Sequence, residues 1–184
     1  WRAAARQARL AGRLEAWEDL LERAQAAAGR AGDESAQFDA RFQGLSARML
    51  RLGAESVLET LQRWLVREKR PTQRSRLQSM LGEALLLQIR PVPALAAGEK
   101  ALRLAEPASP EWFEATVLMG RALAMAGRTA DAIGRLQAAH QAMPAFIEPL
   151  RALRAKAALA NALHLARRHV EALHWQSMAV ADAR

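Results

Sequence analysis

A small residue recurs along this chain at positions 46, 82, 120 and 160, with separations of 36, 38 and 40 residues. Each copy lies in similar surroundings, which are clearest between Thr116 and Pro144. There the order is Met119-Gly120, Leu123, a Gly127-Arg128 turn, and then Ala132, Leu136 and Ala139. Self-similarity at such a period is typical of repeat proteins, in which each unit covers one apolar side of the next. The spacing therefore predicts an array of repeated units.

Composition indicates what each unit is made of. The chain has 43 Ala among 184 residues, but only 13 β-branched residues. Because alanine is the best helix former and β-branched residues favour strands, we expect an all-α fold. Ser109-Pro110-Glu111 is a typical helix start, with a cap, a proline at the first position and an acid in the first turn. The expected helices span residues 13–30, 34–52, 54–69, 73–89, 92–106, 110–126, 129–142, 146–166 and 169–183.

The small residues mark where paired helices approach closely. Helix axes come within about 8 Å only where small side chains face one another. Gly120 opposite Ala132 and Ala139 provides such a contact, with Leu123 and Leu136 filling the space beside it. Large aromatic side chains in helical pairs usually fill the seam between helices. We therefore expect core positions for Trp17, Trp64, Trp112 and Trp175.

The clearest unit resembles the tetratricopeptide repeat, in which Leu-Gly between aromatic positions on one helix precedes Ala, a bulky residue, Ala and Pro on the next. The resemblance covers about residues 39–183 and is strongest over 113–144. Thr116, Gln78 and Lys156 replace the first aromatic, and the period exceeds the family's 34 residues. The resemblance implies a right-handed superhelical α-solenoid of about four antiparallel helix pairs, with a partial leading one. We expect one domain over residues 1–184, with units near 1–32, 33–70, 72–107, 110–144 and 146–184.

The resemblance also implies a non-enzymatic scaffold that binds a protein or peptide partner. Because the sequence starts with Trp1 rather than Met, we expect it to be part of a longer protein. Its Arg- and Ala-rich composition suggests a bacterium, and a sensory or regulatory region is the leading interpretation. An assembly factor of an envelope or secretion complex is the alternative.

Other expectations concern ligands and location. We expect no cofactor, and a second copy of the chain stays open as a partner. The longest uncharged apolar run, near residues 84–89, is far shorter than the roughly 20 residues that cross a bilayer. Membrane insertion is therefore not expected. The cytoplasm is the expected compartment, with the periplasm left open.

The candidate binding surface is the inner face of the first helix in each unit. We place there the residue after each small residue, together with residues three or four positions away. Arginines would hold carboxylates, and methionines would adapt to apolar side chains of a peptide. The predicted groove comprises Arg76, Met80, Glu83, Val117, Arg121, Met125, Arg154, Asn161 and His164, continued upstream by Gln43, Ala47 and Arg51. Arginines that merely solvate this face are the alternative.

A basic stretch surrounds Pro71. The chain has a net charge of +8, of which +6 falls within residues 63–105. The predicted basic patch comprises Arg63, Arg67, Lys69, Arg70 and Arg74, and Glu68 is the acidic residue among them. Clustered cations can neutralise phosphates, but Trp64 is the only aromatic residue nearby, which gives base stacking little support. A solvated surface is the leading interpretation, followed by an acidic protein partner and then by nucleic acid.

Catalytic and metal-binding signatures are not found in the sequence. It contains no phosphate-binding loop, nucleophile elbow or cysteine. His164, His169 and His174 are separated by five residues, whereas a metal-binding pair on one helix needs three or four, so we expect surface or packing roles for them and for His140. Glu15, Glu18, Asp19 and Glu22 are predicted to form a solvated acidic face, with a charge-complementary partner as the alternative.

Overall fold

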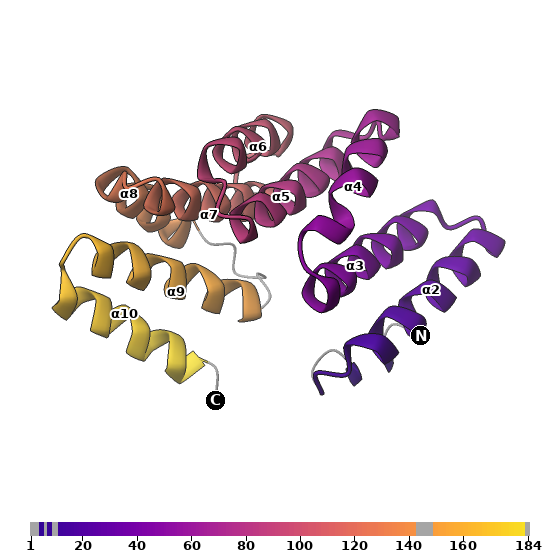
Figure 1. The fold of residues 1–184 in the computed structure, drawn as a ribbon, viewed down its shortest axis with the longest axis horizontal. Coiled ribbons are helices and arrows are strands. Elements are labelled where there is room, and N and C mark those ends of the chain that lie inside the picture. The colour runs from indigo at the N-terminus through magenta and orange to yellow at the C-terminus, as the bar shows by residue number, and fades with distance from the viewer. Residues whose placement is uncertain (1–3, 6, 9–10, 143–148, 183–184) are drawn as a thin grey trace. The chain divides into compact units, whose positions relative to one another are not determined.

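The computed structural model describes residues 4–5, 7–8, 11–142 and 149–182, and these residues form helices and turns without a strand (Figure 1). The labelled helices are α2 (Leu14–Arg30), α3 (Glu34–Leu52), α4 (Glu55–Arg67), α5 (Pro71–Leu87), α6 (Pro91–Leu104), α7 (Pro110–Met125), α8 (Thr129–Gln141), α9 (Pro149–Leu165) and α10 (His169–Asp182). The all-α prediction is confirmed, and the described helix ends lie within two residues of the predicted ones, except at the start of α9. The predicted helical residues 146–148 and 183 lie outside the described residues.

Contacts divide the chain into two compact units, residues 1–63 and 64–184. The first unit contains α2, α3 and most of α4, and the second contains the end of α4 and helices α5 to α10. The expected single domain and the superhelical path stay predictions. Each unit is described below by itself.

In the first unit, α2 and α3 form an antiparallel pair. Gly32 adopts a left-handed φ of 69° in the turn, and the Asp33 side chain accepts a 2.8 Å hydrogen bond from the Ala36 backbone N–H, which caps α3. Trp17 is buried against Leu21 and Ala47, which confirms its predicted core position. This small core explains why the pair is compact despite its many charged residues.

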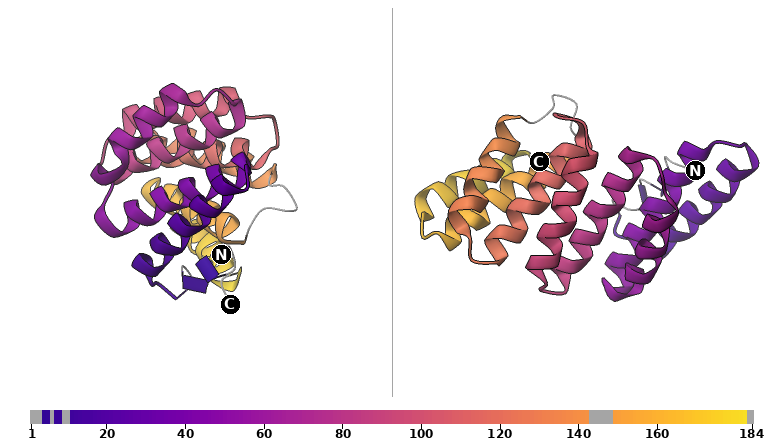
Figure 2. Two further views of the ribbon diagram at one scale, coloured as in Figure 1. Left: turned by 90° about the vertical axis from the view of Figure 1, so that its right-hand side faces the viewer. Right: turned by 90° about the horizontal axis from the view of Figure 1, so that it is seen from above.

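In the second unit, the pairs are α5 with α6, α7 with α8, and α9 with α10 (Figures 1 and 2). Helix α7 is the centre of this unit, because it contacts α5, α6, α8 and α9. From Phe113 to Ala124, every residue of α7 is buried except Glu114 and Arg121, which are half-buried. Charged groups on α7 are therefore confined to a few positions between apolar contacts.

Three glycines allow α7 to pack closely against neighbouring helices. A Cβ atom at Gly120 would lie 2.4 Å from Cγ of Leu136 on α8, which is closer than real Cβ contacts. The same holds for Gly82 on α5, where Cβ would lie 2.4 Å from Leu118, and for Gly98 on α6, where it would lie 2.6 Å from Met119. A close approach is found at Gly120, but the side chain that faces it is Leu136, whereas the prediction placed Ala132 and Ala139 there.

The turns inside the three pairs of the second unit share one geometry although their sequences differ. In each, a backbone N–H donates a 2.9 Å bond to a carbonyl five residues earlier: Arg90 to Leu85, Arg128 to Leu123 and Arg168 to Leu163. The residue before each donor is left-handed, and these residues are Ile89, Gly127 and Arg167. This shared turn is a structural counterpart of the repeated sequence pattern.

A buried polar contact joins α5 to α6. The hydroxyl of Ser75 donates a 2.9 Å hydrogen bond to the carbonyl oxygen of Ala101, and Ser75 is fully buried. The same carbonyl accepts the backbone N–H of Ala105 at 3.1 Å. A carbonyl has two lone pairs, so both bonds can be made and the buried hydroxyl is satisfied.

Candidate protein-binding surface

The first helices of the three pairs, α5, α7 and α9, bring charged side chains together. Helix α7 lies next to both α5 and α9, so residues one repeat apart meet on neighbouring helices. Both carboxylate oxygens of Glu83 on α5 accept hydrogen bonds from Nη1 of Arg121 on α7. Nη2 of Arg154 on α9 lies 3.3 Å from Oε1 of the same carboxylate. Three of the predicted groove residues thus meet at one carboxylate.

The three side chains of this cluster differ in how exposed they are to solvent. The side chain of Glu83 is 20% exposed, that of Arg121 is 31% exposed and that of Arg154 is 51% exposed. Two guanidinium groups share one carboxylate, so the cluster carries one excess positive charge. Arg154 makes no other ion pair with a residue that the structure describes, and a guanidinium has five N–H donors. The exposed donors of Arg154 can therefore donate hydrogen bonds to a further carboxylate.

A second ion pair links α7 and α9. Nε of Arg151 lies 3.3 Å from Oε1 of Glu114, and both side chains are partly exposed. We define the first-helix face by the charged side chains Glu83, Glu114, Arg121, Arg151 and Arg154 on α5, α7 and α9. Sequence reasoning included Glu83, Arg121 and Arg154 but missed Glu114 and Arg151, which lie outside the positions derived from the small residues.

The apolar part of the predicted groove is wrong at two of its three residues. Met80 and Val117 are only 4% and 6% exposed, so they offer almost no surface to a partner. The reason is that a first helix in this unit packs against neighbouring first helices as well as against its own second helix. Met125 is exposed at the end of α7, Asn161 and His164 are exposed on α9, and Arg76 is half-buried on α5.

The predicted upstream continuation belongs to the first unit and serves its core. Ala47 is fully buried beside Trp17, so it is not a groove residue. Arg51 donates through Nε at 3.0 Å and Nη2 at 2.8 Å to Oε2 of Glu18, and Nε of Arg48 donates to Oε1 at 3.1 Å. These bonds tie α3 to α2.

The prediction of a solvated acidic face is wrong for Glu18, which is buried. Its residue is 6% exposed, whereas Glu15, Asp19 and Glu22 are exposed as expected. Burial alone raises the pKa of Glu18, but the hydrogen bonds and charges of Arg51 and Arg48 together outweigh burial and lower the pKa below its usual value. The carboxylate is therefore ionised at neutral pH and acts as an internal tie.

The predicted basic patch is partly neutralised. Arg63 lies 3.6 Å from Glu59 in the first unit. In the second unit, Arg70 donates to both oxygens of Glu68 at 2.9 and 3.0 Å. The Glu68 carboxylate also accepts backbone N–H groups of residues 69 and 70, and these bonds, led by Arg70, lower its pKa. Exposed cations without an ion pair to a described residue are Arg67, Lys69 and Arg74.

Two histidines that the sequence spacing did not predict to pair lie close together in the turn between α9 and α10. Nδ1 of His164 lies 3.3 Å from Nδ1 of His169, and both rings are exposed. The helix-spacing rule missed this pair because the chain reverses between the two residues. Aligning the repeated turns is the signal that could have found it. No group of three or more His, Cys, Asp or Glu side chains within the described residues could hold a metal ion.

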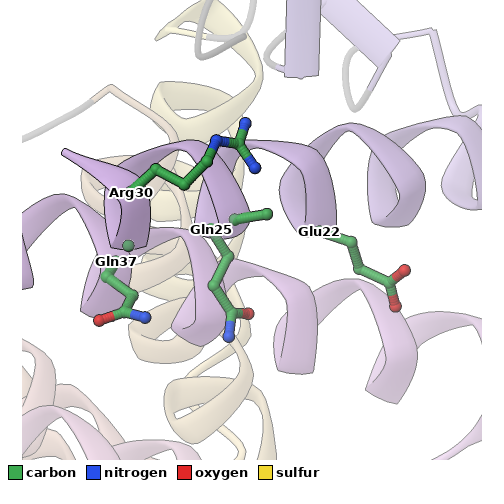
Figure 3. Close-up of a pocket in the computed structure, with 6 residues that line it drawn as sticks. Glu22, Gln25, Arg30 and Gln37 are labelled. Carbon is green, nitrogen blue, oxygen red and sulfur yellow. The ribbon is translucent and has the colours of Figure 1, made fainter.

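An open pocket of about 580 Å³ lies between α2 and α3 of the first unit, lined by Glu22, Gln25, Ala26, Gly29, Arg30 and Gln37. Figure 3 shows that the labelled polar side chains spread apart instead of converging on one point. A specific small-molecule site usually has a few converging polar groups in an apolar cavity. The pocket is therefore a weaker candidate for a functional site than the first-helix face.

Comparison with known proteins adds information on the fold. No family model and no curated protein matches the chain. Two solved structures of a kinesin light chain from Podosopora anserina, described as putative and as having nearly identical TPR-like repeats, are similar over 97% of this chain. The two structures share 16% and 15% sequence identity with this chain. The matched regions cover 90% and 91% of their chains, and the TM-scores are 0.64 and 0.62.

The fold is a tetratricopeptide-like helical repeat. The resemblance drawn from residues 39–183 is thereby confirmed at the level of fold. Tetratricopeptide-like repeats commonly mediate protein–protein interactions and are generally not enzymes. None of the helices in the described residues is long and apolar enough to span a membrane.

Proposed function

We propose that this tetratricopeptide-like chain binds an acidic segment of a protein or peptide on its first-helix face, as part of the regulatory or sensory region of a larger bacterial protein. The observation that carries the proposal is the shared carboxylate of Glu83, which leaves two guanidiniums with one internal counter-charge. Arg154, the most exposed of the three, offers its outer donors to a partner.

The chemistry of this face favours carboxylates over a long apolar segment. Because Met80 and Val117 are buried, an apolar peptide would find few exposed side chains on the middle of α5 and α7. An arginine fork binds a carboxylate with two parallel hydrogen bonds, which gives both energy and orientation. The expected partner segment therefore carries spaced Asp or Glu residues.

Nucleic acid is the weaker candidate. Glu59 and Glu68 already pair with two arginines of the basic patch, which lowers the positive charge available to phosphates. An acidic peptide needs only one or two cations, whereas nucleic-acid affinity rises with each phosphate that a protein neutralises. The first-helix face fits the former requirement.

The test is an array of peptides that carry Asp and Glu, printed beside the same peptides with Asn and Gln. We expect the wild-type chain to bind members of the acidic set in preference to their neutral copies. For those peptides, Arg154→Gln should weaken binding about tenfold, or about 1.4 kcal/mol, since it removes a charge-assisted hydrogen bond. Glu83→Gln should strengthen binding, because it removes the internal competitor.

The matched control is Arg103→Gln on α6, an exposed arginine without an ion pair to any described residue. It has the same change of net charge as Arg154→Gln but lies outside the first-helix face. Equal weakening by both variants would show that overall charge, and not this face, attracts the peptides. Equal binding of the acidic and neutral sets would overturn the proposal.

A further inference from the structure

The turn between α9 and α10 brings two imidazole rings together at the surface. His164 is in the last turn of α9, and His169 is the first residue of α10. Their Nδ1 atoms are 3.3 Å apart, and the ring centres are 5.0 Å apart with the ring planes 63° from parallel. Both residues are exposed.

This geometry matches two ligands of one metal ion. A tetrahedral ion with metal–nitrogen bonds of about 2.05 Å separates two nitrogens by about 3.3 Å and two imidazole centres by about 5.2 Å. A straight N–H···N hydrogen bond at the observed nitrogen separation would instead place the ring centres about 5.6 Å apart. The observed 5.0 Å is closer to the arrangement in which both lone pairs point toward a common ion.

The turn fixes this arrangement. The Arg167 backbone N–H donates to the carbonyl of His164 at 2.9 Å, and the Arg168 N–H donates to the carbonyl of Leu163 at 2.9 Å. In the two equivalent turns of this unit, the positions of the histidine pair are held by Leu86 with Pro91 and by Ala124 with Thr129. The shared turn therefore brings the two positions together, and this copy alone places a nitrogen ligand at both.

The nearby charges permit a cation. The guanidinium of Arg168 is engaged by Glu171 through bonds of 2.7 and 2.6 Å, so its charge is balanced locally. The C-terminal end of α9 carries a partial negative charge and the N-terminal end of α10 a partial positive charge, so the two helix ends roughly offset one another at this turn. Arg167 in the same turn is exposed, and its charge opposes metal binding.

We infer that His164 and His169 form a binding site for a divalent transition-metal ion of the zinc, nickel and copper class, held through both Nδ1 atoms. Neutral imidazole is a preferred ligand of these ions. Each ring then carries its proton on Nε2, and solvent fills the remaining coordination positions. This site is independent of the proposed peptide binding, which uses the guanidiniums of Arg121 and Arg154.

The experiment is titration of the untagged full chain with Zn²⁺, and separately with Ni²⁺, by isothermal titration calorimetry. We expect one ion per chain, reversed by a chelator. Long-range proton–nitrogen NMR should show that Zn²⁺ shifts the Nδ1 signals of these two rings and leaves a proton on each Nε2. His164→Ala and His169→Ala should each lower affinity by at least about tenfold, an effect that even outer partners of metal ligands reach.

The control is His174→Ala, another exposed histidine on α10 that is not part of the pair. It should bind Zn²⁺ as the wild type does, and circular dichroism should show the same helicity for all three variants. The inference is overturned if the wild type binds no metal or if His174→Ala loses as much affinity as His164→Ala. A proton found on one of the two Nδ1 atoms at saturating Zn²⁺ would also overturn it and would identify a simple hydrogen-bonded pair.

Discussion

The two units of this molecule use the same set of charges, one glutamate between two arginines, in different environments. In the first unit, Glu18 joins Arg48 and Arg51 inside a single helix pair, and its side chain is 8% exposed. In the second unit, Glu83 is 20% exposed and joins Arg121 and Arg154 from two other helix pairs. The comparison teaches that burial, more than ion pairing itself, separates a charge that holds the fold from one that a partner can reach.

The two units also close their helix pairs by different means. The pair of α2 and α3 is tied by the buried carboxylate of Glu18, whereas α7 is seated by the close contacts of Gly82, Gly98 and Gly120. The glycine contacts of the second unit are apolar, whereas its ion pairs between first helices are partly exposed.

The largest expected effect comes from breaking a glycine contact of the second unit. Gly120→Leu adds a side chain where a Cβ atom alone would lie 2.4 Å from Leu136. Overpacking of this kind costs about 1–3 kcal/mol and often more, and the Leu136 contact is close to the backbone of α7. Equilibrium urea unfolding, followed by circular dichroism, should show a large loss of stability.

Gly134→Ala on α8 is the matched control, since a Cβ atom there meets nothing within 4 Å. It should stabilise α8 by about 0.5–1 kcal/mol because alanine has less conformational freedom to lose. If Gly120→Leu unfolds at the same urea concentration as the wild type, small-residue contacts do not hold the second unit.

An intermediate effect is expected in the first unit. Glu18→Gln leaves Arg48 and Arg51 without their buried counter-charge, which should cost about 1–3 kcal/mol. Because the folded-state pKa of Glu18 is lowered from 4.5, its contribution is present above that pH and is lost as the pH falls through the folded-state pKa. The stability difference between wild type and variant should therefore shrink below about pH 4.5.

Hydrogen exchange of α2 and α3, measured at neutral and acidic pH, checks this prediction within the first unit. Glu15→Gln is the matched control, because Glu15 is 84% exposed and lies 3.9 Å from Arg51. An exposed pair of this kind contributes about 0–1 kcal/mol. Equal changes for both variants would mean that burial does not separate the two carboxylates.

The smallest effect on stability is expected for Glu83→Gln. Its side chain and those of Arg121 and Arg154 are partly exposed, so water and salt screen the interaction, and the cost should stay below about 1 kcal/mol. Urea unfolding at low and high salt measures it. A loss as large as that of Glu18→Gln would contradict the comparison and would assign the cluster a structural role.

The helices could be predicted from the sequence because alanine content, caps and glycine turns act locally. The close approach at Gly120 was predictable for a related reason, since a missing side chain on a periodic apolar helix usually marks the place where a neighbouring helix comes close. How deeply a side chain on a helix face is buried was not predictable in the same way. Met80 and Val117 have the correct helical phase for the first-helix face, but packing between α5, α7 and α9 buries both.

The charged contacts show a second limit of sequence reasoning. Helical phase placed Glu18 among exposed acids, but the arginines that bury it come 30 and 33 residues later in the chain. His164 and His169 were judged by helix spacing, although a turn separates them. Long-range pairing of polar side chains depends on how helices dock, which a single helix does not encode.

The hydroxyl of Ser75 has a consequence for how the α5–α6 pair assembles. A seam of alanines and leucines is nearly uniform along its length, so two such helices could slide by one turn and still bury apolar surface. In that shifted pairing the hydroxyl would lose the Ala101 carbonyl, and an unsatisfied buried donor costs about 1–3 kcal/mol. The Ser75 hydroxyl therefore disfavours shifted alignments of α5 and α6, in addition to the close contacts that Gly82 and Gly98 make with α7.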